Sequence, residues 1–212
     1  MLHVFGVNGL SAYIGLTGIG RPRAGETVFV TGAAGGVGSI ACQIARLLGC
    51  RVIGSAGGAA KCAWLRDVAR LDACIDHRHD DMRARLAQYA PKGIDVVFDN
   101  TGGPALEAAL DHIAIGARIV LCGSIASGYR DGDYGQGPRN YMQLAFRRAR
   151  MEGFIFLDHV ETFPAAFAFL SRWRAAGEIR VEETISDGLE TAPAALSDLF
   201  RGANLGKQLV RP

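Results

Sequence analysis

The chain has 212 residues, 49% of them hydrophobic, and carries 23 basic and 21 acidic side chains for a net charge of +2. This length and composition predict a packed globular protein with one large domain, or one domain and a fragment of another. The nearly balanced charge gives no general basic surface, so we expect no nucleic-acid partner.

The five cysteines are scattered through predicted strands and helices, with no CxxC and no Cys/His ligand spacing. This distribution indicates reduced, mostly buried thiols and no metal site. We expect no signal peptide, and no apolar run approaches the length of a membrane span. We therefore expect a cytoplasmic protein without a membrane partner.

Strand and helix patterns alternate along most of the chain. Residues 4–19 have the apolar spacing of a short helix, and a loop follows to residue 25. Later patterns predict strands at 27–30, 51–55, 73–76, 94–98, 118–122 and 151–157, helices at 40–48, 59–66, 80–89, 106–110, 141–148 and 163–176, and a glycine-rich loop at 128–137. The alternation predicts an α/β Rossmann fold, a doubly wound parallel sheet that binds ligands at the carboxyl ends of its strands.

A glycine-rich turn follows the first predicted strand, in the segment TVFVTGAAGGVGS. Gly35, Gly36, Val37 and Gly38 stand where this strand gives way to a helix. Without side chains the backbone can turn sharply, and a phosphate can approach the first amide groups of the helix. The turn therefore predicts a nucleotide site, and a tight turn with no ligand is the alternative.

The second predicted strand ends without the carboxylate that NAD sites use to bind the ribose hydroxyls. No acidic residue occurs from Ser39 through Arg66, and Ser55 and Lys61 follow the strand instead. A hydroxyl and an ammonium suit the ribose 2′-phosphate, so we predict NADP(H) rather than NAD(H). The alternative is that Lys61 is a solvated lysine on a helix.

Further polar residues are predicted at the same rim, because Asn100 follows the fourth strand and residues 122–127 follow the fifth. Asn100 could also be a turn former before Gly102.

Three other classes of protein that use similar glycine turns can be checked against the sequence. Short-chain dehydrogenases need a tyrosine with a lysine four residues later, and no tyrosine here has one. An NTP-hydrolysing phosphate loop needs a lysine after its glycines, but Ser39 follows Gly38. A methyltransferase would normally have an acidic residue after the second strand, and none is there.

Six segments together resemble the zinc-free medium-chain dehydrogenases/reductases, in the group of NADPH-dependent alkenal, prostaglandin and curcumin reductases: GLSAYIGL, AGETVFVTGAAGGVGS, AGGAAKCAWL, FDNTGG, GPRNYMQLAFRRARMEGF and GANLGKQLV. The resemblance spans nearly the whole chain. It implies that residues 35–38 hold the pyrophosphate and Lys61 the 2′-phosphate. It also implies that Tyr129 lies beside nicotinamide and substrate, and that the rest of the site is lined by Asn100, Cys122, Gly123, Ser124, Ile125, Phe154, Ile155, Phe156 and Asn204.

The chain departs from the family pattern at two places. Where the family usually has tyrosine, in a segment like FNYK, this chain has IDHR, which puts His77 in that place with Arg78 beside it. His77 could bond a phosphate, more strongly when protonated, or be an exposed loop histidine. The second departure is at the start, where the β-rich N-terminal domain of the family is absent, so one wall of the active-site cleft is expected to be missing.

These observations divide the chain into a leading helix and linker at 1–26, an NADP-binding Rossmann domain at 27–184 and a C-terminal segment at 185–212. In the family the last segment packs on the N-terminal domain. The apolar residues expected to lack a partner are therefore Ala195, Leu196, Leu199, Phe200 and Val210. An uncovered apolar face tends to find another chain, so we expect association, as a homodimer, or local disorder of the segment.

The resemblance also implies the chemistry. NADPH would deliver a hydride to the β-carbon of an α,β-unsaturated ketone or aldehyde, Tyr129 would hydrogen-bond the developing oxyanion, and no metal would take part. The missing domain is expected to impair this activity. The alternative is a module that binds NADP(H) and has no catalytic activity of its own.

Overall fold

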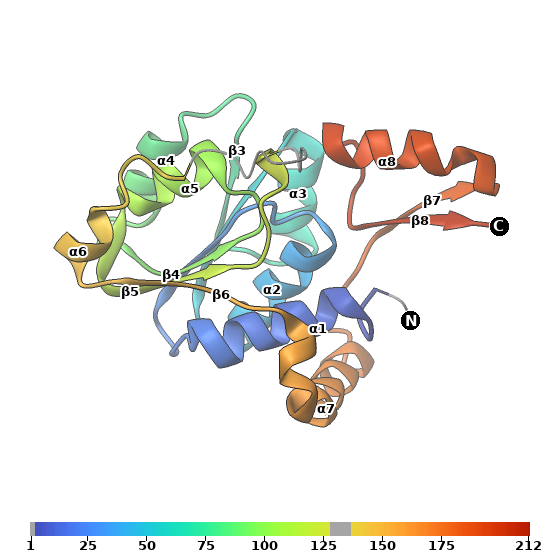
Figure 1. Cartoon of the computed structure of the whole chain (residues 1–212), viewed down its shortest axis with the longest axis horizontal. Helices are drawn as coiled ribbons and strands as arrows, with labels where there is room; N and C mark the ends of the chain where they lie inside the picture. Colours follow the sequence, from blue (N-terminus) through green and yellow to red (C-terminus); the bar gives the residue numbers. More distant parts are fainter. Residues whose placement is uncertain (1–2, 128–136) are drawn as a thin grey trace.

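The computed structural model describes residues 3–127 and 137–212. Within these residues six parallel strands form one sheet in the order β3-β2-β1-β4-β5-β6 (Figure 1). The strands are β1 (Thr27–Val30), β2 (Arg51–Ala56), β3 (Ala73–Asp76), β4 (Ile94–Asp99), β5 (Ile113–Leu121) and β6 (Arg150–Gly153). The chain starts this sheet at a central strand and winds outward in both directions, which confirms the predicted doubly wound fold.

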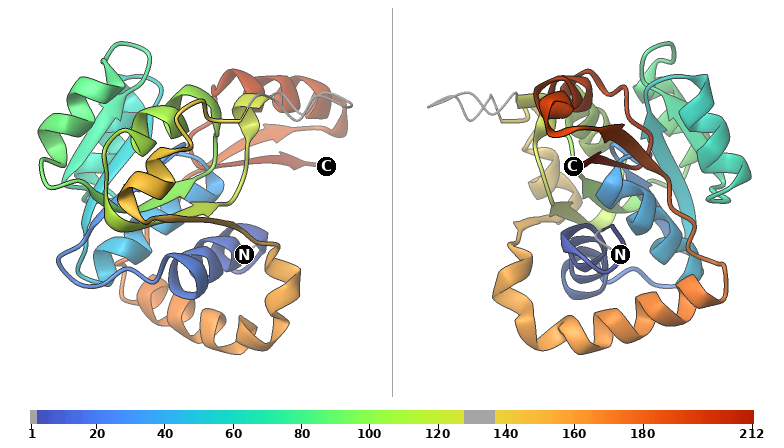
Figure 2. Two further views of the ribbon diagram at one scale, coloured as in Figure 1. Left: turned by 60° about the vertical axis from the view of Figure 1, so that its left-hand side comes forward. Right: turned by 90° about the vertical axis from the view of Figure 1, so that its right-hand side faces the viewer.

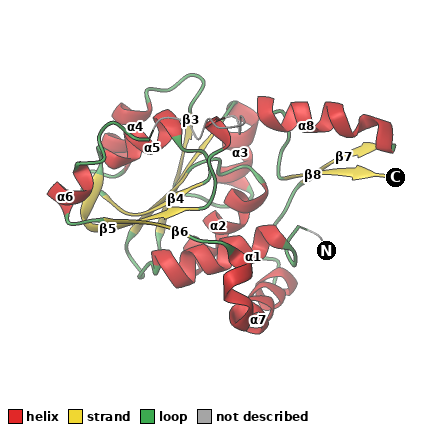
Figure 3. Ribbon diagram, in the orientation of Figure 1, coloured by secondary structure: helices red, strands yellow, loops and turns green. Residues whose placement is uncertain are grey.

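Helices cover both faces of the sheet (Figure 3). One face is covered by α1 (Val7–Ile14), α2 (Gly36–Leu47) and α3 (Ala59–Asp67), and α7 (Phe163–Ala175) packs on the outside of α1. The other face is covered by α4 (Met82–Tyr89), α5 (Gly103–Leu110) and α6 (Gln143–Arg147). In β1, Val28 and Val30 join the first core while Phe29 joins the second. Successive residues of a strand point to opposite faces of the sheet, so the short strand β1 contributes side chains to both hydrophobic cores.

The sequence predicted one short helix within residues 4–19, but the structure has two different helical segments there. After α1 the chain continues as a π-helix, η1 (Gly15–Gly20). A Cβ at Gly15 would lie 2.7 Å from Cε2 of Phe98 and 2.9 Å from Cζ of Phe154. The glycine therefore allows the backbone of η1 to approach the aromatic core closely.

The fifth and sixth strands differ from their predicted lengths. β5 begins at Ile113 because it already pairs with Ile94 there, before an irregularity in the register. β6 ends at Gly153, where a strand to residue 157 was predicted, and a 3-10 helix, η3 (Phe156–Thr162), follows. Phe156 stacks on Phe163 with ring centroids 6.1 Å apart, so packing against helices replaces strand geometry at this point.

The C-terminal segment forms a separate two-stranded parallel sheet that projects from the main body (Figures 1 and 2). It comprises β7 (Glu183–Asp187), the 3-10 turn η4 (Leu189–Thr191), α8 (Ala192–Arg201) and β8 (Lys207–Arg211). Leu196 and Phe200 are 55% and 50% exposed, in line with the prediction, but Ala195 is 5% exposed. The prediction for Ala195 was therefore wrong, because α8 packs against β8.

Candidate functional site

The glycine-rich turn lies between β1 and α2. Gly35 is the residue before the first turn of α2, and Gly38 lies within that turn. A Cβ at Gly38 would come within 2.3 Å of the carbonyl oxygen of Gly32, so only glycine lets α2 begin this close to β1. The N–H groups of a first helical turn lack intrahelical acceptors, and here they stand at the carboxyl edge of the sheet. The turn can therefore receive an anion.

Asn100 lies on the neighbouring strand end, across the point where the winding of the sheet reverses. Its side-chain amide donates to the carbonyl oxygen of Thr31 at 2.7 Å, and its backbone N–H donates to Thr31 Oγ1 at 2.8 Å. Thr31 Oγ1 in turn donates to Asp99 at 2.6 Å. This network orients Asn100 beside the glycine-rich turn, at the position where doubly wound folds bind their ligands.

Asp99 and Thr31 were not among the residues singled out from the sequence. Asp99 is 1% exposed, and burial raises the pKa of its carboxyl group despite hydrogen bonds from Thr31 and from the N–H of Gly102. The available signal was a carboxylate at the last position of the apolar strand β4, next to Asn100. Asp99 accepts hydrogen bonds from the N–H groups of Thr101 at 3.2 Å and Gly102 at 3.0 Å, and these bonds tie the turn after β4 to the strand.

The predicted residues Cys122, Gly123, Ser124 and Ile125 follow β5 and are half-buried. The N–H of Cys122 donates to the carbonyl oxygen of Asp99 at 2.8 Å, so this segment is tied to the end of β4. A Cβ at Gly102 would lie 2.7 Å from Ser124 Oγ, which shows how closely the two strand ends approach. Burial raises the pKa of the Cys122 thiol to about 12, so this thiol is neutral at physiological pH.

Three side chains that can be cationic gather at the outer end of the same rim. A Cβ at Gly57 would lie 2.8 Å from Arg78 Nε and 3.0 Å from His77 Nε2. Lys61 lies near Arg78, because Lys61 Nζ and Arg78 Nη2 would lie 4.0 Å and 3.9 Å from a Cβ at Gly202. Burial and then the charge of Arg78 lower the pKa of Lys61. Burial, Arg78 and Lys61 lower the pKa of His77 against the opposing charge of Asp76. Mutual repulsion of this kind is relieved by a bound anion.

The carboxylate of Asp76 organises the backbone around these cations. It accepts hydrogen bonds from the N–H groups of Gly58 at 2.8 Å and Arg78 at 3.1 Å. Burial opposes ionisation, but the hydrogen bonds, first that from Gly58 and then that from His79, bring the pKa of Asp76 down to about 2. Asp76 therefore holds the loop after β2 and the loop after β3 together.

The C-terminal segment reaches the outer end of the rim and the glycine-rich turn at its centre. Lys61 Nζ donates to the carbonyl oxygen of Gly202 at 2.7 Å, and Arg78 donates to that of Arg201 at 3.2 Å, so both cations meet the C-terminal end of α8. Asn204 is 6% exposed, and its amide donates to the carbonyl oxygen of Gly206 at 2.8 Å. Gly206 N–H donates to Ala34 at 2.8 Å, which brings Asn204 beside the glycine-rich turn.

The remaining predicted site residues differ in exposure and in packing. Ser55 is 1% exposed at the end of β2, and its carbonyl oxygen accepts from Ala33 N–H at 2.9 Å. The rings of Phe154 and Phe156 pack with the helices, whereas Ile155 between them is 60% exposed. Tyr129 lies outside the described residues.

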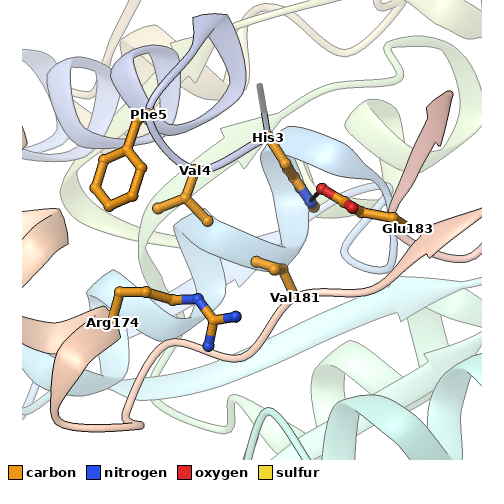
Figure 4. A pocket seen from close by; sticks show the side chains of 6 residues that line it. All are labelled: His3, Val4, Phe5, Arg174, Val181 and Glu183. Atoms are coloured by element: carbon orange, nitrogen blue, oxygen red, sulfur yellow. Dashed lines mark ion pairs between the residues drawn. The ribbon is translucent and has the colours of Figure 1, made fainter. Parts of the chain in front are cut away.

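A small pocket behind the glycine-rich turn contains a residue that sequence reasoning missed (Figure 4). His3, 1% exposed, donates from Nε2 to the carbonyl oxygen of Gly36 at 2.9 Å, and its Nδ1 lies 4.0 Å from Glu183 Oε1. Burial lowers the pKa of His3, so the neutral ring is favoured. His3 thus holds the first turn of α2 through the carbonyl oxygen of Gly36, and nothing in the local sequence pattern marks it.

Metal binding finds no support in the part of the chain that the structure describes, residues 3–127 and 137–212. In these residues no group of three or more His, Cys, Asp or Glu side chains could hold a metal ion. Nor does any helix among them combine the length and apolar character needed to cross a bilayer.

The comparisons with known proteins agree with one another. A family model described as "Zinc-binding dehydrogenase" matches residues 36–172. A putative NADP-dependent oxidoreductase of Bacillus subtilis, YfmJ, is 42% identical over 99% of this chain, and the NADPH-dependent curcumin reductase of Escherichia coli is 39% identical over the same share. The chain spans 62% of the length of each of these relatives.

Two solved structures of NADPH complexes are also similar to this chain. CurA from Vibrio vulnificus, in complex with NADPH, superposes with a TM-score of 0.92 at 40% identity, covering 99% of this chain and 64% of CurA. The quinone oxidoreductase of Escherichia coli, complexed with NADPH, has a TM-score of 0.81 at 26% identity, covering 97% of this chain and 63% of that one.

Proposed function

The chain belongs to the zinc-binding dehydrogenase family, and we propose that it is an NADPH-dependent oxidoreductase that reduces the carbon–carbon double bond of α,β-unsaturated ketones or aldehydes. One observation carries the proposal. The glycine-rich turn, Asn100 and residues 122–125 converge where the winding of the sheet reverses, and Lys61, His77 and Arg78 converge at the outer end of the same rim. This arrangement supports the proposal, because it suits a dinucleotide with an additional phosphate.

The residues of the rim fit the cofactor. The first turn of α2, at residues 35–38, would hold the pyrophosphate on its N–H groups, and Lys61 and His77 would hold the 2′-phosphate, with Arg78 beside them. Gly57 leaves space next to these cations that a Cβ would fill. We propose that the rest of the cofactor contacts Ser55, Asn100, Cys122, Gly123, Ser124, Ile125, Phe154, Ile155, Phe156 and Asn204.

In the proposed reaction, bound NADPH supplies the hydride that adds to the β-carbon of the substrate. Negative charge then builds on the carbonyl oxygen, and Tyr129 donates a hydrogen bond to it. The α-carbon takes up a proton to complete the reduction. The task of the chain is therefore to orient the two reactants and to stabilise the oxyanion.

We propose that no metal takes part, as the resemblance to the zinc-free reductases implies. We propose a homodimer as the working form and the cytoplasm as its location. The five cysteines are free thiols, which suits a reducing compartment. The substrate is a small-molecule enone or enal.

The test pairs two measurements on the chain as it stands: NADPH binding by fluorescence, and NADPH oxidation with a panel of enones and enals followed by absorbance. Binding with oxidation is the expected result. Binding without oxidation would select the alternative, a module that holds NADP(H) without catalysis. Failure to bind would reject both.

Replacing Tyr129 by Phe tests the catalytic assignment. Loss of one hydrogen-bond donor to an oxyanion lowers kcat by about 10²-fold or more, so enone turnover should fall by that order. NADPH affinity should remain nearly unchanged, since the ring is retained. Unchanged turnover in steady-state kinetics would remove Tyr129 from the mechanism.

A further inference from the structure

Two buried thiols lie in contact between α3 and β3. The sulfur atoms of Cys62 and Cys74 are 2.6 Å apart, and Cys74 donates its S–H to Cys62. The two residues are 3% and 8% exposed. We propose that Cys62 and Cys74 are a reversible oxidation site, a dithiol that hydroperoxides convert to a disulfide joining α3 to β3.

The geometry requires little movement. A disulfide has an S–S distance of about 2.05 Å, so the two sulfur atoms already lie within roughly half an ångström of bonding distance. The other three thiols have no such arrangement in the described residues: the Cys50 thiol, for example, donates to the carbonyl oxygen of Arg23 at 3.4 Å. The proposal is therefore specific to one pair.

The surroundings indicate which thiol reacts first. Cys62 lies in the first turns of α3, with Lys61 before it and Arg66 one turn later. Burial and the charges of Asp76 and Asp80 raise the pKa of Cys62, whereas the hydrogen bond from Cys74 and the charge of Arg66 act in the opposite direction. Burial and the contact with Cys62 both raise the pKa of Cys74. Cys62 is the attacking thiol of the pair, because it accepts the hydrogen bond from Cys74, and a hydrogen bond to a sulfur favours its thiolate.

The chemistry balances with a hydroperoxide as the oxidant. The Cys62 thiolate attacks one peroxide oxygen, the O–O bond breaks, and a sulfenic acid forms with release of hydroxide, or of alkoxide from an alkyl hydroperoxide. The Cys74 sulfur then attacks the Cys62 sulfur, the S–O bond breaks and the oxygen leaves as water, while Cys74 loses its proton. With hydrogen peroxide, two thiols are oxidised by two electrons and one peroxide is reduced to two waters.

The bond would join two elements of the rim. Cys62 is adjacent to Lys61, and Cys74 lies two residues before Asp76, which holds Gly58 and Arg78. A link that closes a loop over a separation of 12 residues restricts the unfolded chain, so the oxidised form should be the more stable one. Formation of the bond does not depend on the proposed function, because it needs no cofactor.

The experiment treats the full chain with hydrogen peroxide in slight excess, then denatures it, alkylates the free thiols and maps the peptides by mass spectrometry. We expect two of the five thiols to escape alkylation, a linked peptide pair containing Cys62 and Cys74, and full reversal by dithiothreitol. The thermal midpoint of the oxidised chain should rise by about 5 °C.

Cys50→Ser is the matched control, because it removes a thiol that is also buried and leaves the pair intact. It should behave as the parent chain does, whereas Cys62→Ser and Cys74→Ser should form no linked peptide. Five alkylated thiols after peroxide, or a linked peptide between other cysteines, would overturn the proposal. The map of the parent chain decides the matter even if a serine variant fails to fold.

Discussion

At the scale of the residue, Lys61 provides the sharpest test of cofactor choice. Its ammonium is half-buried beside His77 and Arg78, where the 2′-phosphate is proposed to bind. Lys61→Ala should weaken NADPH binding by about 10- to 100-fold, the usual value of a charged hydrogen bond. NADH binding should change little. It serves as the internal control, because the substitution also removes the hydrogen bond from Lys61 to Gly202, and that loss would affect the binding of both cofactors. An unaltered ratio of the two dissociation constants, measured by fluorescence titration, would contradict the assignment.

His77 makes a separate prediction about pH. In the free chain burial, Arg78 and Lys61 lower its pKa below 6.5. A 2′-phosphate dianion would favour the imidazolium, so binding should raise this pKa and take up a proton. NADPH affinity should therefore increase as the pH falls through the window between two pKa values of His77, the raised one in the complex and the lowered one in the free chain. The increase should be about tenfold for each pH unit within that window.

The measurement is the NADPH dissociation constant across this pH range, divided by that of NADH to remove effects common to both. His77→Gln keeps a hydrogen-bonding group but cannot titrate, so its ratio should vary less with pH. The titration of the phosphate itself near pH 6 remains in both proteins and cancels in their comparison. Equal pH dependence in the two would show that His77 does not contact the phosphate.

At the scale of the element, the contact between α2 and β1 depends on Gly38. A Cβ there would lie 2.3 Å from a backbone oxygen of Gly32, so α2 would have to shift in Gly38→Ala. Overpacking of this kind costs about 1–3 kcal/mol in the free energy of unfolding. Gly18→Ala is the control, because its nearest new contact would be at 3.9 Å. Chemical denaturation should separate the two, and equal midpoints would count against the close packing of the turn.

At the scale of the whole molecule, the projecting C-terminal segment should determine how the chain associates. Leu189, Leu196 and Phe200 are 68%, 55% and 50% exposed on the η4–α8 stretch. Apolar surface of this kind favours contact with another chain. We expect light scattering to report dimers or larger species, and Leu196→Ser with Phe200→Ser to shift the mass toward the monomer. A monodisperse parent monomer whose residues 185–212 are protected from hydrogen exchange would refute this.

Much of the fold was predictable because the signals are local. Period-two and helical apolar patterns predicted every strand of the main sheet, and β1 and β3 have the predicted bounds. The glycine-rich turn was also predictable, since a sharp strand-to-helix connection needs glycine within a few residues. The family resemblance, which rested on short motifs, is confirmed by the match to residues 36–172 and by relatives named as NADP-dependent curcumin and alkenal reductases, whereas independence of zinc stays a prediction.

What the sequence by itself determined was therefore the parallel sheet, the turn that faces the proposed cofactor and the family. The tertiary structure alone decided which distant groups meet: His3 with Gly36, Lys61 with Gly202 across 141 residues, and Asp99 with Thr31. It also showed that the Cys62 and Cys74 thiols touch and that Ala195 is covered. Periodicity reports which face of an element is buried, but not which residue of another element lies against it, and that pairing is settled only when the layers pack.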